Sequence, residues 1–68
     1  MSDLFEDQPH TFTLSQMVSC AEREVIKRKA AYPRFIESGM MSEAKARHEI
    51  DCMQAIADKL KGERDGQA

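Results

Sequence analysis

The stretch TLSQMVSCAEREVIKRKAAYPRFIESG, residues 13–39, decides the fold of this 68-residue chain. Thr13 is placed as a helix N-cap, and Gln16, three residues on, completes a capping box. Gly39 suits the left-handed residue that closes a helix. Between them, seven residues recur at alternating spacings of four and three, which puts them on one helical face. They are Leu14, Val18, Ala21, Val25, Arg28, Tyr32 and Phe35.

Pro33 lies inside this series. A proline removes one helical hydrogen bond and clashes with the carbonyl four residues back. Either the helix kinks at Pro33, or it stops near Tyr32 and restarts with Pro33 at the first position of a second piece. The apolar period continues to Phe35 and Ile36, so we predict one helix over 13–38 that is kinked near Pro33.

A second apolar series predicts another helix over residues 42–61. Ser42 is the expected N-cap, and Gly62 is expected to stop the helix. The apolar positions again follow a four–three spacing: Ala46, Ile50, Met53, Ala57 and Leu60. The intervening loop of about three residues favours antiparallel neighbours. We therefore expect an all-α antiparallel two-helix hairpin over 13–61, preceded by an acidic flexible arm (1–12) and followed by a disordered tail (62–68).

Size and composition narrow the class of protein. Hydrophobic residues make up 41% of the chain, and the formal net charge is −2. A lone hairpin of this length is marginal in water. The wide apolar stripes predict a homodimer, with two hairpins forming a four-helix bundle. No apolar run approaches the ~20 residues of a membrane span, and no signal peptide is visible, so we expect a cytoplasmic protein with no membrane partner.

The residue types needed for catalysis or metal binding are not arranged to cooperate. The chain has no glycine-rich phosphate loop and no paired carboxylates, so we expect no enzyme and no cofactor. His48 and Cys52 share a helical face, but folding the hairpin about 39–40 places Cys20 opposite residue 59, about 10 Å of helix rise away from Cys52. We therefore expect a surface His48 beside a semi-buried Cys52, with neither a metal site nor an intrachain disulfide.

Three bases in a row, Lys27, Arg28 and Lys29, form the strongest local charge feature. Together with Arg34 and Arg47, the two lysines make up a basic set that predicts, as the alternative function, a nucleic-acid-associated regulator. The simpler interpretation is a solvated charged face, because glutamates are interleaved in the same helix and the whole chain is acidic.

Arg28 stands apart from the other bases because it occupies a position in the apolar series. An arginine there lays its stem on apolar neighbours. We expect it to pair across the helices with Glu49 or Asp51, fixing the register at some cost in stability.

The acidic arm carries three carboxylates and no lysine or arginine. Leu4 and Phe5 lie among these acids, which is typical of a short motif that becomes ordered when it binds a protein. Asp3-Leu4-Phe5 resembles the last three positions of the bacterial sliding-clamp pentapeptide. The alternative is that Leu4 and Phe5 pack back on the hairpin.

Three short segments carry a resemblance to a known group of proteins: Ala21-Glu22-Arg23-Glu24, Tyr32-Pro33-Arg34-Phe35 and His48-Glu49-Ile50, with Gly39 between the last two. They resemble the corresponding segments of small prophage-encoded helical proteins of proteobacteria. The resemblance covers about residues 17–60. It implies a phage or prophage gene product and no particular activity. Within it, Tyr32, Pro33 and Arg34 combine residue types found at interface hot spots, although Pro33 alone also accounts for a structural kink. The predicted function is therefore a small non-enzymatic protein that binds and modulates another protein of host or phage.

Overall fold

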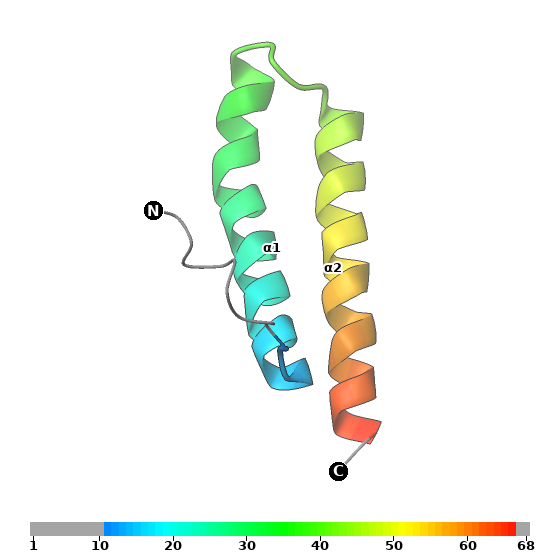
Figure 1. Ribbon diagram of the computed structural model, residues 1–68. Coiled ribbons are helices and arrows are strands. Elements are labelled where there is room, and N and C mark those ends of the chain that lie inside the picture. Colours follow the sequence, from blue (N-terminus) through cyan, green and yellow to red (C-terminus); the bar gives the residue numbers. More distant parts are fainter. Residues whose placement is uncertain (1–10, 67–68) are drawn as a thin grey trace, which may run out of the picture.

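The computed structural model describes residues 11–66, which form two helices of 24 residues each. Helix α1 spans Leu14–Glu37 and helix α2 spans Glu43–Gly66. The helices lie side by side and antiparallel, joined by one short connection (Figure 1). The predicted all-α antiparallel two-helix hairpin is confirmed. Residues 1–10 lie outside the described residues, so the expectations for Leu4 and Phe5 stay predictions.

Helix α1 begins where the sequence predicts. The Gln16 backbone N–H donates to the Thr13 hydroxyl at 3.1 Å, and the Thr13 N–H donates to the Gln16 side-chain oxygen at 2.9 Å. These two bonds form the capping box and satisfy N–H groups that have no partner within the helix. Helix α1 then runs without interruption through Pro33 to Glu37, so the continuous helix is confirmed. A kink at Pro33 stays a prediction.

The turn closes α1 and starts α2 with local bonds. Gly39 adopts φ +83°, the left-handed conformation expected of it. The N–H groups of Met40 and Met41 both donate to the Phe35 carbonyl, at 2.9 and 3.2 Å. On the other side of the turn, the Lys45 N–H donates to the Ser42 hydroxyl at 3.1 Å, which confirms Ser42 as a cap. These caps fix the short loop that makes the helices antiparallel.

Helix α2 is longer than the sequence predicts. We expected a stop at Gly62 and a disordered tail over 62–68, but the helix continues through Gly62 to Gly66, so this expectation is wrong for residues 62–66. A glycine inside a helix costs only about 1 kcal/mol relative to alanine, and it ends a helix only when it turns left-handed. In the described chain, Gly39 is the only glycine with a positive φ. An ion pair one turn apart, Lys59 Nζ to Glu63 Oε2 at 4.0 Å, also spans Gly62.

The core between the helices consists of small side chains. In residues 11–66, the buried apolar residues are Val18, Ala21, Val25, Ala46 and Ala57. All five belong to the two predicted apolar series. The larger members of those series, such as Tyr32 and Ile50, are only half-buried at the edges of the seam. Neither described helix has an apolar stretch long enough to span a lipid bilayer.

Candidate functional site

An open groove lies between the two helices at the end of the hairpin nearest the turn. Its volume is about 700 Å³. An open groove of this kind suits docking of another surface better than enclosure of a small ligand. We call it the turn-end groove, and it is lined by Lys29, Tyr32, Pro33, Ile36, Glu43, Ala44, Ala46, Arg47, Ile50 and Asp51.

The helical repeat and the interhelical register together assemble this lining. Residues three or four apart share one side of a helix. Lys29, Pro33 and Ile36 follow that spacing on α1, and Arg47 and Asp51 follow it on α2. Folding the chain about Gly39–Met40 brings Lys29 level with Ile50 and Pro33 level with Ala46, all of which line the groove.

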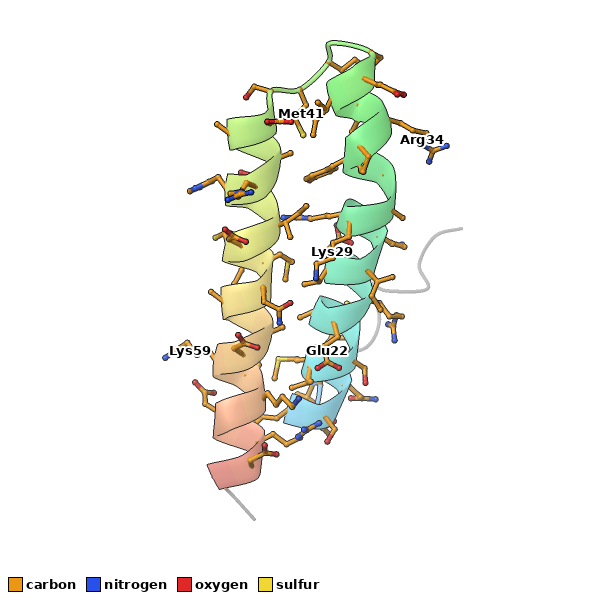
Figure 2. The ribbon with its side chains drawn as sticks, turned by 180° about the vertical axis from the view of Figure 1, so that it is seen from behind. Glu22, Lys29, Arg34, Met41 and Lys59 are labelled. Atoms are coloured by element: carbon orange, nitrogen blue, oxygen red, sulfur yellow. The ribbon has the colours of Figure 1, made fainter. Side chains whose placement is uncertain are left out.

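A partly exposed ion pair links the two helices nearer the other end of the hairpin. Lys61 Nζ lies 3.8 Å from Glu22 Oε2, which joins α2 to α1. Glu22 lies seven residues before Lys29 and therefore shares its side of α1. The labelled Glu22 and Lys29 lie on the same face of the hairpin in Figure 2.

The floor of the groove is apolar and partly covered. Ala46 is only 3% exposed, and Tyr32 and Ile50 are half-buried. The Tyr32 ring packs on Phe35 with a centroid distance of 5.9 Å and an interplanar angle of 37°. This contact holds the tyrosine in place, so its exposed edge is presented to the groove with limited conformational freedom.

The rim of the groove carries charges that are not neutralised in pairs. Lys29, Glu43, Arg47 and Asp51 form no ion pair within residues 11–66, although Arg47 lies four residues from both acids on α2. Two positive and two negative groups therefore surround an apolar floor. A partner with complementary charges can pair with them without first breaking an internal ion pair.

The structure brings together some of the predicted site residues and separates others. Tyr32 and Pro33 both line the groove, but Arg34 does not. Figure 2 shows Arg34 projecting from α1 on the side away from α2, whereas Lys29 lies beside the space between the helices. The predicted trio of Tyr32, Pro33 and Arg34 is therefore not one surface, because consecutive helical residues point about 100° apart.

The predicted nucleic-acid set divides in the same way. Lys29 and Arg47 line the turn-end groove, whereas Lys27 and Arg34 do not. Lys27 and Arg34 are seven residues apart and share a different side of α1. The four bases form two separate pairs.

Arg28 occupies the seam and bonds to both helices. Its Nε donates to Glu24 Oε2 at 3.1 Å, and its Nη1 donates to the backbone carbonyl oxygen of Glu49 at 2.8 Å. The Glu49 carboxylate lies farther away, at 3.7 Å. The predicted pairing of Arg28 with Glu49 is confirmed, and its shortest link is to the main chain. The hydrogen bond that Arg28 donates to the Glu24 carboxylate raises the pKa of Arg28 above its ordinary value, with burial opposing the shift.

The cysteines and histidine do not form a site. Cys20 and Cys52 are both free and exposed, so the expectation of a semi-buried Cys52 is wrong. Cys52 precedes the half-buried Met53 by one residue, so its side chain points about 100° away from that of Met53 and is exposed. His48 is exposed, as expected. In the part of the chain that the structure describes, no group of three or more His, Cys, Asp or Glu is placed to hold a metal ion.

Sequence reasoning did not identify the remaining groove residues as part of a site. Ile36 and Ile50 were assigned only to the apolar series. The signal was present in the register, because folding the chain about Gly39–Met40 places Ile36 level with Glu43, and both line the groove. No family model, curated protein or solved structure matches the chain.

Proposed function

We propose that this chain is a small non-enzymatic protein that binds another protein through the turn-end groove and so modulates that partner. Its setting, which follows from the sequence resemblance, is the cytoplasm of a bacterium that carries the encoding phage or prophage. The observation that supports binding is the groove itself, where four unpaired charges surround an apolar floor. Interfaces share this anatomy of an apolar centre and a polar rim.

The groove suits an amphipathic helix of the partner. A third helix laid between α1 and α2 would place its apolar side chains on Tyr32, Ala46 and Ile50. Helix-in-groove recognition depends on such anchors at spacings of three, four and seven residues. Pro33 adds an acceptor at the edge, because a proline has no N–H to donate to the Lys29 carbonyl four residues back.

The geometry supports protein binding better than nucleic-acid binding. Phosphate recognition is strengthened by each lysine or arginine that contacts a phosphate, and a carboxylate on the same surface repels the phosphates. The turn-end groove has Lys29 and Arg47, but Glu43 and Asp51 line it as well. In the turn-end groove, the alternative function as a nucleic-acid-associated regulator therefore has two bases with two carboxylates beside them.

A pair of alanines provides the test. Ala44 and Ala55 are both exposed on α2, but only Ala44 lines the groove. A photocrosslinking residue at position 44 is expected to give a discrete adduct in a proteobacterial lysate, and the same residue at position 55 is not. Mass spectrometry then identifies the partner.

Direct binding to the purified partner completes the test. Ala44→Trp fills the groove and is expected to abolish binding, whereas the control Ala55→Trp leaves the affinity unchanged. Tyr32→Ala is expected to weaken binding by about 1–3 kcal/mol, the range of a moderate hot spot. Equal affinities for the two tryptophan variants would show that the partner binds elsewhere.

A further inference from the structure

A second surface lies on the outer side of α1, away from the groove. Six residues spaced alternately four and three apart form one continuous stripe along the helix. All six are exposed, three are cations, and none is a carboxylate. We call this surface the basic stripe, and its residues are Gln16, Cys20, Arg23, Lys27, Ala30 and Arg34.

The cations of the basic stripe have no partners in residues 11–66. Arg23, Lys27 and Arg34 make no ion pair there. The two acids nearest to Arg23 are already engaged, since Glu22 pairs with Lys61 at 3.8 Å and Glu24 with Arg28 at 3.1 Å. The stripe therefore presents three positive charges that α1 and α2 leave uncompensated.

The stripe begins in a depression near the N-terminal end of α1. This depression has a volume of about 550 Å³ and is lined by Phe12, Ser15, Gln16, Met17, Ser19, Cys20 and Arg23. Three of its residues belong to the basic stripe. The side chains of Phe12 and Met17 give it an apolar wall, so the surface as a whole combines an apolar recess with a row of cations.

The segment that enters α1 has the complementary composition. Residues 1–10 contain Asp3, Glu6 and Asp7, no lysine or arginine, and the apolar pair Leu4 and Phe5. The segment joins the hairpin at residue 11, next to the depression. Because residues 1–10 belong to the same chain as the stripe, they can bind it without an association step between molecules.

Its length also matches. An extended chain spans up to about 3.3–3.6 Å per residue, so Asp7 reaches about 14 Å from residue 11. Arg23 lies eleven residues beyond Phe12, or about 17 Å along the helix axis, and its long side chain bridges the difference. Asp3 reaches about 28 Å, which extends past Lys27.

We propose that residues 1–10 dock on the basic stripe of the same chain. The carboxylates of Asp3, Glu6 and Asp7 lie against Arg23 and Lys27, the cations within their reach, and Leu4 and Phe5 lie along the apolar wall of the depression. A short tether holds the segment at an effective concentration in the millimolar range, which favours binding in cis over an external anion. The arm thereby shields the stripe from polyanions, and the turn-end groove remains free.

Paramagnetic relaxation tests this with a label beside the stripe and outside the depression. A nitroxide is attached at position 26 of a chain that carries Ile26→Cys, Cys20→Ser and Cys52→Ser, because Ile26 is exposed next to Lys27 and does not line the depression. The amide signals of residues 3–7 are recorded. With the native cations in place they are expected to lose most of their intensity. In a chain that also carries R23Q, K27Q and R34Q, or in 1 M salt, where exposed charges are screened, the intensity is expected to return. Circular dichroism checks that the helices are unchanged.

A second experiment needs no nitroxide label and changes the acidic residues of the arm instead of the bases of the stripe. Neutralising the arm with D3N, E6Q and D7N is expected to shift the amide resonances of Arg23 and Lys27 while leaving those of Ala55 and Lys59 on α2 unmoved. The proposal would be overturned if the signals of residues 3–7 stayed broadened after the three glutamine substitutions. It would also be overturned if the resonances of Arg23 and Lys27 did not shift when the arm is neutralised. Either result would leave the stripe open to an external anion. Broadening of an unlabelled ¹⁵N chain mixed with a nitroxide-labelled chain would place the contact between molecules and refute docking in cis.

Discussion

Arg28 gives the sharpest stability prediction, because its main contact with α2 is a backbone oxygen. Its Nη1 lies 2.8 Å from the Glu49 carbonyl oxygen but 3.7 Å from the Glu49 carboxylate. Glu49→Ala removes the carboxylate and keeps the carbonyl. Arg28→Ala removes every contact at once. The two substitutions are therefore expected to have unequal effects, although a simple ion pair would make them similar.

The magnitudes follow from exposure and geometry. The Arg28 side chain is 24% exposed, and those of Glu24 and Glu49 are 43% and 33% exposed, so solvent screens both ion pairs. Arg28→Ala loses a charged hydrogen bond to a carbonyl and the packing of its stem, which together cost about 1–2 kcal/mol of unfolding free energy. Glu49→Ala costs below about 0.5 kcal/mol, the usual value of a screened pair. Glu24→Gln loses a pair one turn apart and costs about 0.3–0.5 kcal/mol.

Urea unfolding followed by circular dichroism at 222 nm measures all three variants against the native chain. Equal m-values are required, so that differences in midpoint report stability. A loss for Glu49→Ala as large as that for Arg28→Ala would refute the reasoning, because it would make the carboxylate the principal partner. Arg28→Met is the matched variant that keeps the stem, and it is expected to be more stable than Arg28→Ala.

Two further predictions concern the glycines and the oligomeric state. Gly62→Ala is expected to raise the unfolding free energy by about 0.5–1 kcal/mol because Gly62 is helical, and Gly39→Ala to lower it by about 1–2 kcal/mol because Gly39 has φ +83°. Both glycines have open space around them, so no clash complicates the comparison. Chemical unfolding measures both changes, and a gain in stability at Gly39 would contradict the argument. Light scattering across a concentration series is expected to give a dimer of the 7.7 kDa chain. Ile56→Glu is expected to convert it to a monomer, because Ile56 is 45% exposed beside the seam, whereas the control Ala55→Glu leaves the dimer intact. A native chain that is monomeric at every concentration would exclude the four-helix bundle.

The fold was predictable because several local signals agree. The capping pair Thr13 and Gln16, the left-handed Gly39 and the four–three apolar spacing each indicate the same hairpin. The end of α2 was not predictable from Gly62, since a glycine marks a helix end only through its φ, and φ depends on whether the following residues continue the helix. Here the residues after Gly62 continue the helix to Gly66, and one ion pair, Lys59 with Glu63, spans the glycine.

The candidate site was only partly predictable, and the reason is geometric. Tyr32-Pro33-Arg34 is a motif in sequence but not a surface, because three consecutive helical residues span more than half a turn. The groove combines Tyr32 and Pro33 with Arg47 and Asp51 from the other helix. Pairing residues across the turn identifies those partners, whereas reading along the chain does not.

The same geometry gives the run Lys27-Arg28-Lys29 three separate roles. Lys27 lies on the basic stripe, Arg28 bonds across the seam, and Lys29 lines the turn-end groove. A block replacement of all three would lower stability, free the arm and weaken partner binding together, and would suggest one basic site where there are three environments.

Single substitutions separate the three roles. Lys27→Gln is expected to weaken arm docking alone, Arg28→Ala to lower stability, and Lys29→Gln to weaken partner binding with the fold and the arm unchanged. Loss of partner binding in Lys27→Gln would contradict this division, because it would join the stripe and the groove into one functional surface.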